Sequence, residues 1–420
     1  MKKRMITLAL AATLGISMMG CGNKETGTSA SQEPSATQEP SASQESEVAA
    51  HFEKISENGE KAVNGFGISL FKECYSDKNT CISPMSIYVA LAMTAEGADT
   101  DTLAEMEKTL GMSVAEMREY INKYMDTLDS TGNTKVKMAN SIWTNESYVE
   151  KFKETLMSEI SENYRAELIH EGFSSETADH INKWVEEHTD SLIKNIINEI
   201  PKDAVMYLIN TITFDGVWAE QYEDNNIYDD LFHKEDGSTE TQTFLHSYEG
   251  KYLASEDSTG FIKYYKDNRF AFVGILPEVG VSMKDYVAGL SDEKFATLIN
   301  SASNDTVNVA IPEFESDYKS ELQNYLKTLG MGNAFEKETA DFNKFTEDDN
   351  SMYINRVIHQ THVEVNRKGT KAAAATIVEM KDECLAAPME DYCVFLDRPF
   401  VYVILDVEQN LPLFIGTYEG

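Results

Sequence analysis

The sequence predicts a single α+β domain with antiparallel sheets, and three observations lead to this fold class. The chain has 420 residues, of which 42% are hydrophobic and 10% aromatic, enough to form a large core. Helical patterns dominate the first half of the chain, and strand patterns dominate the second half. Helices and strands that are segregated along the chain are typical of α+β folds rather than of alternating α/β folds.

The first residues predict an exported protein with a lipid anchor. A basic start, MKKR, precedes an apolar run at 6–19 that has the length of a signal peptide and is too short to span a membrane comfortably. The run ends in Met-Met-Gly-Cys, which is similar to a bacterial lipobox, whose cysteine (here Cys21) is lipidated after cleavage. We therefore expect a signal peptide at residues 1–20 and a protein held on the extracellular face of the bacterial cell membrane, or shed or secreted from it.

Residues 21–49 contain a low-complexity repeat, SQEPSATQEPSASQES, that has no apolar face and cannot offset its ordering entropy. We expect a flexible stalk there and one folded domain at 50–420. The formal net charge of −35 argues against nucleic acid and anionic membrane surfaces as partners, so the only membrane contact we expect is the lipid anchor.

Cysteine usage excludes a scaffold built on disulfides. Apart from Cys21, the chain has Cys74, Cys81, Cys384 and Cys393, too few for a domain of this size to depend on them. A Cys384–Cys393 or Cys74–Cys81 disulfide and free thiols are both compatible with this spacing.

Capping and periodicity signals predict the helices of the first half. Ser83-Pro84 should begin a buried helix, because proline favours the first turn and the residues after it are almost wholly apolar. Two capping boxes, Thr-x-x-Glu and Ser-x-x-Glu, predict two more helices. The expected helices cover 52–71 with a break near Gly65 and Gly67, the segments that begin at Ser83, Thr102 and Ser113, then 152–160 and 177–193, with Gly111 ending the one that begins at Thr102.

Alternating and apolar segments predict strands, mostly in the second half. Residues 204–214 form a long apolar run that we expect to be a central strand, and 261–265 with 270–276 should form a hairpin. Further strands are expected at 136–144, 307–311, 400–407 and 413–418. A helix is expected over 317–329, ended by Gly330.

One stretch near the C-terminus combines two conformational preferences. Val363 and Val365 alternate with polar residues, as in a strand. Gly369 and Thr370 then lead into an alanine run, and alanine is the best helix former, but residues that prefer strands follow the alanines. The pattern predicts a segment that can change its conformation.

Motifs from about residue 52 to residue 420 carry a resemblance to a known family. Any one of them is weak, but their order and spacing together are specific. They are Ser83-Pro84-Met85-Ser86-Ile87, Gly97-Ala98 with Thr102, Asn182-Lys183-Trp184-Val185 with Thr189, Asn210 with Phe214, Gly216 and Trp218, Pro312 with Phe314, Leu329-Gly330-Met331, Ala334-Phe335, Ala340-Asp341-Phe342, Asp397-Arg398-Pro399-Phe400 and Pro412-Leu413-Phe414-Ile415-Gly416. In these motifs the chain resembles the serpins, and a bacterial lipoprotein serpin in particular.

The resemblance implies an α+β serpin fold with three β-sheets, about eight to nine helices and an exposed reactive centre loop. It also implies that the protein is no enzyme but a protease inhibitor that acts as a suicide substrate. In the family's inhibitors a serine protease, or in some cases a cysteine protease, attacks the loop and forms an acyl-enzyme. The cleaved loop then inserts into the main sheet as a new strand. We expect a monomer without a heparin-like cofactor, because the helix after Ser113 (EMREYINKYMD) is not basic.

The resemblance also places the moving part of the loop. Its hinge comprises Gly369, Thr370, Ala372, Ala373, Ala374 and Ala375. Because the side chains of an inserted strand alternate between faces, Thr370 and every second residue to Thr376 should face inward, where small side chains fit. Familiar inhibitors carry glutamates around this hinge. The chain has Arg367, Lys368 and Lys371 instead, and we expect them at solvent-facing or edge positions.

Family spacing from the hinge glycine places the reactive bond between Glu383 and Cys384. The stretch is a few residues longer than in familiar members, so Asp382, Cys384 or a later residue is an alternative reactive residue. With Glu383, the target would cleave after acidic residues, either as a Glu-specific serine protease or as an Asp-directed cysteine or granzyme-like enzyme. With Lys381 as the reactive residue, it would be trypsin-like.

Two clusters around the opening of the main sheet are implied by the same resemblance. Ser83, Ser86, Asn210 and His359 match the family's shutter, where the histidine would hydrogen-bond across the gap that must open for the loop. Trp218 matches the tryptophan of the family's breach. The alternative for His359 is an ordinary buried histidine whose hydrogen bonds are satisfied.

Three other functions are compatible with parts of the sequence. His359-x-x-His362 suggests a metal site, but on a strand this spacing points the two rings to opposite faces. Cys384 could be a hydrolase nucleophile, but no glycine-rich context surrounds it, and acidic neighbours would disfavour its thiolate. The main rival is a non-inhibitory surface binding or carrier lipoprotein with the same fold.

Overall fold

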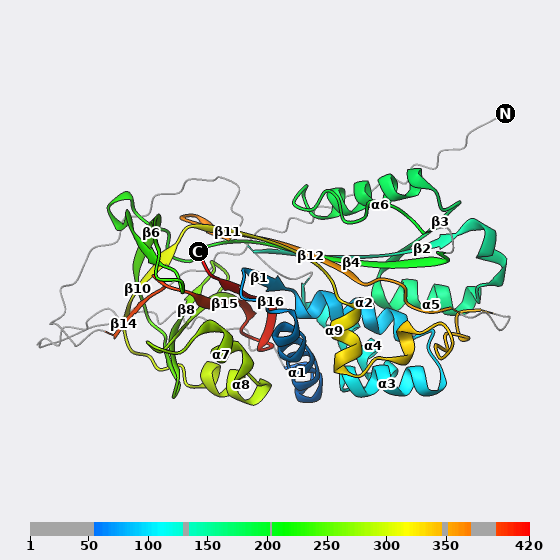
Figure 1. Ribbon diagram of the computed structural model, residues 1–420, viewed down its shortest axis with the longest axis horizontal. Helices are drawn as coiled ribbons and strands as arrows, with labels where there is room; N and C mark the ends of the chain where they lie inside the picture. Colours follow the sequence, from blue (N-terminus) through cyan, green and yellow to red (C-terminus); the bar gives the residue numbers. More distant parts are fainter. Residues whose placement is uncertain (1–53, 129–133, 202–203, 347–351, 371–391) are drawn as a thin grey trace, which may run out of the picture. The chain divides into compact units, whose positions relative to one another are not determined.

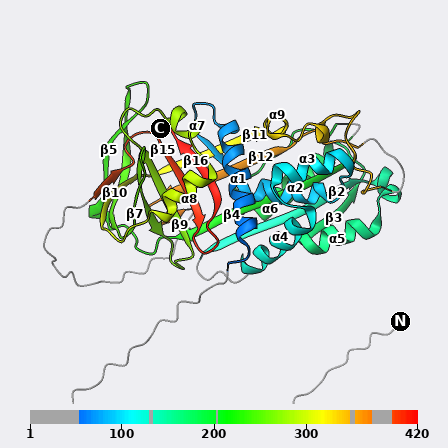
Figure 2. The ribbon, with the colours of Figure 1, turned by 90° about the horizontal axis from the view of Figure 1, so that it is seen from below.

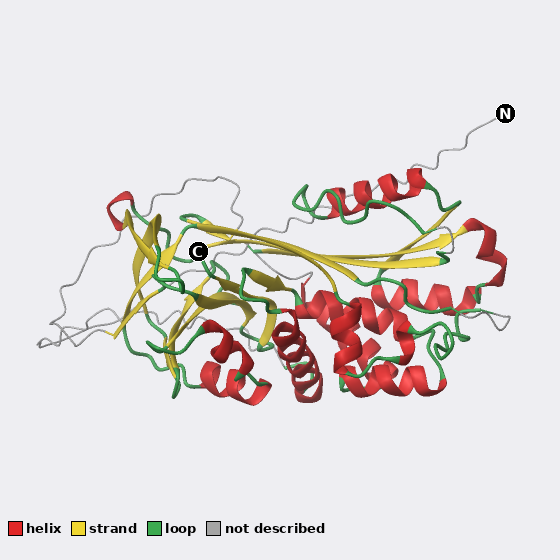
Figure 3. Ribbon diagram, in the orientation of Figure 1, coloured by secondary structure: helices red, strands yellow, loops and turns green. Residues whose placement is uncertain are grey.

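Three β-sheets and the helices packed against them make up the described part of the chain (Figures 1 and 3). The computed structural model describes residues 54–128, 134–201, 204–346, 352–370 and 392–420. The chain divides into two compact units, Met1–His51 and Phe52–Gly420, and every element below belongs to the second. The predicted fold class, α+β with three β-sheets, is confirmed.

Nine α-helices and three short 3-10 helices lie in the described residues. The α-helices are α1 (Glu57–Cys74), α2 (Pro84–Ala95), α3 (Thr100–Leu110), α4 (Val114–Leu128), α5 (Glu154–Tyr164), α6 (Ser175–His188), α7 (Met283–Ala288), α8 (Asp292–Asn300) and α9 (Gln323–Leu329). The 3-10 helices are η1 (Glu146–Lys151), η2 (Asp224–Asn226) and η3 (Asn333–Phe335). None of the described helices is both long enough and apolar enough to cross a bilayer.

The main sheet has the strand order β11-β12-β13-β4-β2-β3. Its strands are β11 (Phe314–Glu321), β12 (Ile358–Asn366), β13 (Gly369–Thr370), β4 (Met206–Val217), β2 (Lys135–Asn145) and β3 (Ala166–Glu171). The predicted central strand is β4, which pairs with β2 along most of its length and carries buried residues on both faces. In Figure 1, α6 covers one face of this sheet, and α2 lies against the other.

Two further sheets complete the fold. The second has the order β1-β16-β15-β9-β8-β7 and the third the order β14-β10-β6-β5. The strands of the second sheet are β1 (Thr80–Ile82), β16 (Leu411–Tyr418), β15 (Phe400–Asp406), β9 (Phe270–Pro277), β8 (Ser258–Tyr264) and β7 (Tyr252–Ala254). Those of the third are β14 (Tyr392–Phe395), β10 (Val307–Pro312), β6 (Thr239–Glu249) and β5 (Ile227–His233). The predicted hairpin is the antiparallel pair β8–β9.

Helix α2 is buried on nearly all sides because its residues are apolar throughout. As predicted, it begins with a proline in the first turn, and the Ser83 hydroxyl caps it by accepting a hydrogen bond from the Ser86 N–H (3.4 Å). The predicted break in α1 at Gly65 and Gly67 is wrong. A Cβ at Gly67 would lie 2.6 Å from the Cβ of Pro84, so this glycine lets α1 and α2 pack closely rather than ending the helix.

Three other predicted boundaries are also wrong. Residues 317–321, expected as the start of a helix, belong to strand β11, which pairs with β12 along its whole length. Helix α6 ends at His188 rather than at 193. Helix α3 begins at Thr100, ahead of the predicted cap at Thr102, whose hydroxyl instead accepts a hydrogen bond from the Asp341 N–H (2.9 Å).

Candidate functional site

The main sheet is open between β12 and β4. Strand β13 lies between them, but it pairs with β12 only at Val365 and Asn366 and with β4 only at Gly216 and Val217. Over the rest of their length, β4 pairs with β2 on its other side and β12 pairs with β11. Strand β4 has about ten residues before Gly216, from Met206 onward, that do not pair with β13, a length of roughly 33 Å. No described strand occupies this gap, which could accept one more strand.

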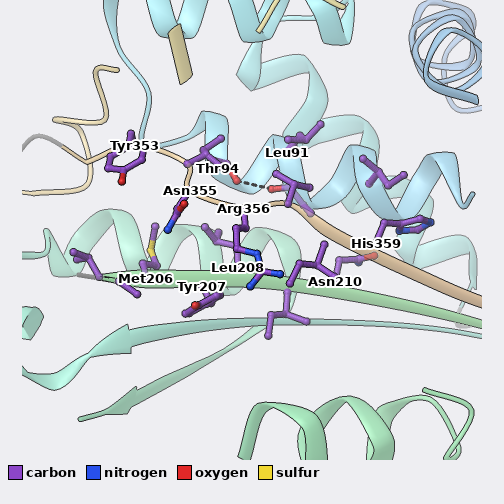
Figure 4. A pocket seen from close by; sticks show the side chains of 18 of the residues that line it. Leu91, Thr94, Met206, Tyr207, Leu208, Asn210, Tyr353, Asn355, Arg356 and His359 are labelled. Atoms are coloured by element: carbon purple, nitrogen blue, oxygen red, sulfur yellow. Dashed lines mark hydrogen bonds between the residues drawn. The ribbon is translucent and has the colours of Figure 1, made fainter. Parts of the chain in front are cut away.

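The wider end of the gap contains a cavity of about 210 Å³ (Figure 4). Residues 206–210 of β4 line one side, and 352–359 leading into β12 line the other. The floor is formed by α2, whose Leu91 and Thr94 are labelled in Figure 4. The gap is therefore a real opening in the sheet, with the apolar surface of α2 beneath it.

The four predicted shutter residues come together here. Ser86, Asn210 and His359 all line the cavity, and Ser83 caps the helix beneath it. Nε2 of His359 accepts a hydrogen bond from the backbone N–H of Ser83 (3.0 Å). Burial lowers the pKa of His359 from 6.5 to about 3, so the imidazole is neutral and can accept this bond.

The predicted hydrogen bond across the gap is wrong. His359 connects β12 to α2 beneath the sheet and does not reach Asn210 on β4. Asn210 donates instead to Oδ1 of Asn140 on β2 (2.6 Å), and its own Oδ1 is buried without a hydrogen-bond partner among the described residues. The two sides of the gap are thus anchored to different neighbours, and they can separate without breaking a bond between these two side chains.

The closed end of the gap contains Trp218, the predicted breach residue, which is 1% exposed. Its backbone N–H donates to the carbonyl of Lys368 (3.0 Å), and its Nε1–H donates to the carbonyl of Asn366 (2.9 Å). Its indole stacks on the ring of Tyr265, with 4.6 Å between centroids. Trp218 therefore holds the turn that joins β12 to β13.

Gly369 and Thr370, the first two predicted hinge residues, are already part of the sheet. The hydroxyl of Thr370 lies 2.5 Å from that of Tyr265, and Thr370 is 2% exposed, facing inward as predicted. A Cβ on Gly369 would overlap the carbonyl oxygen of Gly216, so only glycine allows β13 to lie this close to β4. The other hinge residues, Ala372 to Ala375, lie outside the described residues.

Charged side chains surround this turn on its solvent side. Arg367 and Lys368 are exposed, as predicted for the positions that depart from the family pattern. Arg367 forms an ion pair with Glu313 through Nε (3.1 Å), and its backbone N–H also donates to that carboxylate (2.9 Å). Beneath the turn, Lys263 lies 5.5 Å from the Trp218 ring centroid and pairs with Glu249 (2.6 Å).

Several other predicted site residues lie outside the described part of the chain. These are Lys371, Lys381, Asp382, Glu383, Cys384 and the lipidation residue Cys21. Cys74 and Cys81 are free thiols in the core, and burial raises their pKa values to about 12 and about 11. They are therefore unreactive structural residues.

No metal-binding cluster of three or more His, Cys, Asp or Glu side chains occurs among the described residues. His359 and His362 lie on opposite faces of β12, as the spacing predicts. His359 contacts α2, whereas Nδ1 of His362 lies 2.8 Å from Asp317 on β11.

Sequence reasoning missed Tyr265, Lys263 and Glu313. Tyr265 follows directly after β8, in the segment predicted to be the first strand of a hairpin. That pattern gives no sign that its hydroxyl reaches a residue more than a hundred positions later. Only the pairing of β13 with β4 brings the two together.

Protonation of His359 should loosen this site. The unfolded chain binds a proton at His359 below pH 6.5, and the folded chain does so only near pH 3. The stability that neutral His359 contributes is therefore complete above pH 6.5 and falls as the pH drops, by up to about 1.4 kcal/mol per pH unit. In guanidinium unfolding, the free energy of unfolding of wild type should exceed that of His359→Gln by the largest amount at pH 7.5. This difference in free energy should narrow by pH 5. A difference that does not change with pH would contradict this assignment.

Removing one hydroxyl should release β13. Tyr265→Phe deletes the hydrogen bond to Thr370, worth about 1 kcal/mol, so local opening should become about fivefold more frequent. Hydrogen exchange in peptides that cover residues 365–370 would report this. The matched control is Tyr264→Phe, because no hydrogen bond of the Tyr264 hydroxyl is described. Equal protection in both variants would show that the hydroxyl does not hold β13.

Comparison with known proteins agrees with this geometry. The family described as "Serpin (serine protease inhibitor)" matches residues 61–419. Human Serpin B8 is 30% identical over 372 residues, which cover 84% of this chain and 97% of that protein. The crystal structure of the thermophilic serpin tengpin in the native state superposes with a TM-score of 0.81 at 37% identity, covering 88% of this chain and 95% of that one.

The same tengpin in the latent state gives a TM-score of 0.77 at 35% identity, covering 88% of this chain and 99% of that one. The similarity covers all three sheets and nearly the whole of Phe52–Gly420. The chain belongs to the serpin family.

Proposed function

We propose that this protein inhibits a serine protease as a suicide substrate, by inserting its cleaved loop between β12 and β4. The observation that carries this proposal is the open gap, at whose closed end the first two hinge residues are already paired. The strand that fills the gap would run antiparallel to both neighbours, as β13 does. Because β13 leads directly into residue 371, the chain that follows it is the nearest candidate to fill the gap.

The inserted strand supplies the free energy of the reaction. It would form backbone hydrogen bonds on both sides, each contributing about 0.5–1.5 kcal/mol net, so the total can reach the order of ten kcal/mol. A protease joined to the loop as an acyl-enzyme is pulled along the sheet as the strand forms. Hydrolysis of that ester needs an oxyanion hole and triad held in place within a fraction of an ångström, and traction disturbs them. The serpin contributes no catalytic group of its own.

The alanine run is suited to insertion into the sheet because its side chains are small. Every second residue of an inserted strand faces α2 and the floor of the gap, where Thr370 already lies buried. Ala372 and Ala374 follow in the same alternation and are small enough to pass over that floor. We place the reactive bond at Glu383–Cys384, so the target prefers acidic residues. A Glu-specific serine protease is therefore the first enzyme to test.

Incubation with a Glu-specific serine protease should give an SDS-stable adduct, and mass spectrometry should locate the cut after Glu383. Thr370→Arg puts a charged, bulky side chain at a position that is 2% exposed, and insertion should fail. This variant should be cleaved without forming the adduct, with more than about tenfold more inhibitor consumed per enzyme trapped. The control is Lys368→Glu at an exposed position, which should still trap the enzyme.

A wild-type protein that every protease of a panel cleaves without an adduct, and whose melting temperature does not rise on cleavage, would overturn the proposed function. It would then be a non-inhibitory binding protein with this fold.

We also propose that Cys21 carries a lipid anchor and that residues 21–49 tether the domain to the outer face of the bacterial membrane. The proposal is supported by the basic, apolar and Met-Met-Gly-Cys pattern of residues 1–21. Cells fed an alkyne-labelled fatty acid should incorporate the label into wild type and not into Cys21→Ala, which should appear in the medium. Label that persists in the variant would contradict the assignment to this cysteine.

A further inference from the structure

Exposed aromatic side chains gather on the third sheet, β14-β10-β6-β5. Of the six large hydrophobic side chains that are exposed in the described residues, only Val279 lies elsewhere. The other five are Tyr228, Leu231, Tyr248, Tyr392 and Phe395. Strand register places Tyr228, Tyr248 and Phe395 on one face of this sheet, and Leu231 and Tyr392 on the other. The solvent face of an antiparallel sheet is usually polar, so a face with three exposed aromatic side chains indicates a binding surface.

Ten residues line a depression of about 300 Å³ on this face, and Tyr228, Tyr248 and Phe395 are among them. His246 of β6 lies at its centre, stacked on Tyr228 with 3.9 Å between ring centroids. Phe395 of β14 and Phe244 of β6 each lie 6.4 Å from the same imidazole. Strand register explains the grouping, because His246 and Phe395 both pair with Ala310 of β10 and Tyr228 pairs with Phe244. Figure 2 shows β5 and β10 together at this side of the fold.

Two carboxylates border the aromatic rings, and no lysine or arginine lines the depression. Asp230 of β5 accepts a hydrogen bond from the N–H of Leu231 (2.8 Å), and no ion pair to it is described. Oδ1 of Asp397 lies 3.4 Å from Nη1 of its neighbour Arg398, with which it forms an ion pair. Nη2 of Arg398 donates a hydrogen bond to the carbonyl of Pro277 (2.8 Å). Asp230 is thus the carboxylate available to a ligand.

The ring of His246 adds no positive charge to the depression, because burial lowers the pKa of this imidazole. Aromatic faces beside a carboxylate attract cations. Guanidinium and ammonium groups therefore match both the aromatic rings and the carboxylate of Asp230.

The depression is close in sequence to the predicted reactive bond. Phe395 belongs to β14, which begins at Tyr392, directly after residues 371–391. The chain from Cys384 to Tyr392 can span at most roughly 30 Å, less than the diameter of a typical protease domain. A protease attached at this bond must therefore lie within reach of the third sheet.

We propose that the depression between Tyr228, His246 and Phe395 receives a basic side chain, Arg or Lys, from the surface of the attacking protease. This inference rests on the proposed function and adds a second contact that selects proteases with a cationic rim. The formal net charge of −35 acts in the same direction, because it attracts positively charged enzymes from a distance.

The test compares two charge-neutralising variants on one strand. Asp230→Asn removes the carboxylate at the depression. Asp229→Asn removes the neighbouring carboxylate, which accepts a hydrogen bond from the Thr243 hydroxyl and does not line the depression. With a Glu-specific serine protease that forms the adduct, Asp230→Asn and Tyr228→Ala should lower the second-order rate of adduct formation about five- to tenfold. Asp229→Asn should change it less than about twofold. The inhibitor consumed per enzyme trapped should stay unchanged in all variants, because insertion is intact.

A soluble competitor tests the cation directly. N-acetyl-L-arginine amide at millimolar concentration should slow adduct formation by wild type and not by Asp230→Asn, while the uncharged N-acetyl-L-citrulline amide should do neither. Protease activity on a chromogenic peptide shows that the enzyme itself is unaffected. Equal rates for the two Asp variants, or no effect of the arginine amide, would overturn the inference while the adduct still forms. Absence of any adduct with wild type would overturn the proposed function instead, and the inference with it.

Discussion

The structure depends on an unfilled strand position in its main sheet. Strands β4 and β12 are separated by a two-residue strand at one end and by a cavity over α2 at the other. Unpaired backbone groups inside a sheet are costly, and a sheet edge readily accepts another strand. The native fold therefore retains free energy that one additional strand would release. Under the proposed function, the remaining features of the site would determine when, and by which segment, that position is filled.

Different side chains hold the two ends of the gap. At the closed end, Trp218 and Tyr265 hold the turn and the first inward side chain of the hinge. At the open end, His359 ties β12 to α2 through the Ser83 N–H, whereas Asn210 ties β4 to β2. The two halves of the sheet thus have separate anchors at this end of the gap.

Local signals in the sequence predict the elements near this site well. The cap at Ser83, the central strand and the alternation of β12 are all found where capping and periodicity place them. Local sequence signals fail where long-range strand pairing or packing determines the structure of a segment. Residues 317–321 have no strong strand propensity, yet they pair with β12. The available clue in the sequence was that charged residues at 317, 319 and 321 alternate with Tyr318 and Ser320. Gly67 was interpreted as a helix breaker, although its role is to admit Pro84.

The contacts at the candidate site also divide into those that sequence motifs predict and those that only the fold reveals. The shutter and breach residues were found through motifs, because the family's spacing carries them. The direction of the His359 hydrogen bond was predicted incorrectly, since no sequence pattern says whether a histidine bonds within the sheet or to the helix below. Tyr265 and the Arg367–Glu313 pair connect segments far apart in the chain, and the fold alone brings them together. The aromatic depression likewise arises from the register of three strands.

Strand β14 has a consequence for how long the protein stays usable. It pairs with a single neighbour, β10, over only four residues, at the border of the third sheet. If β14 peeled away, the tether after the hinge would lengthen, and the intact chain could occupy the vacant strand position without any bond being cut. Under the proposed function, such a molecule could no longer trap an enzyme. The four-residue pairing of β14 with β10 would therefore set how long each molecule keeps its strand position unfilled.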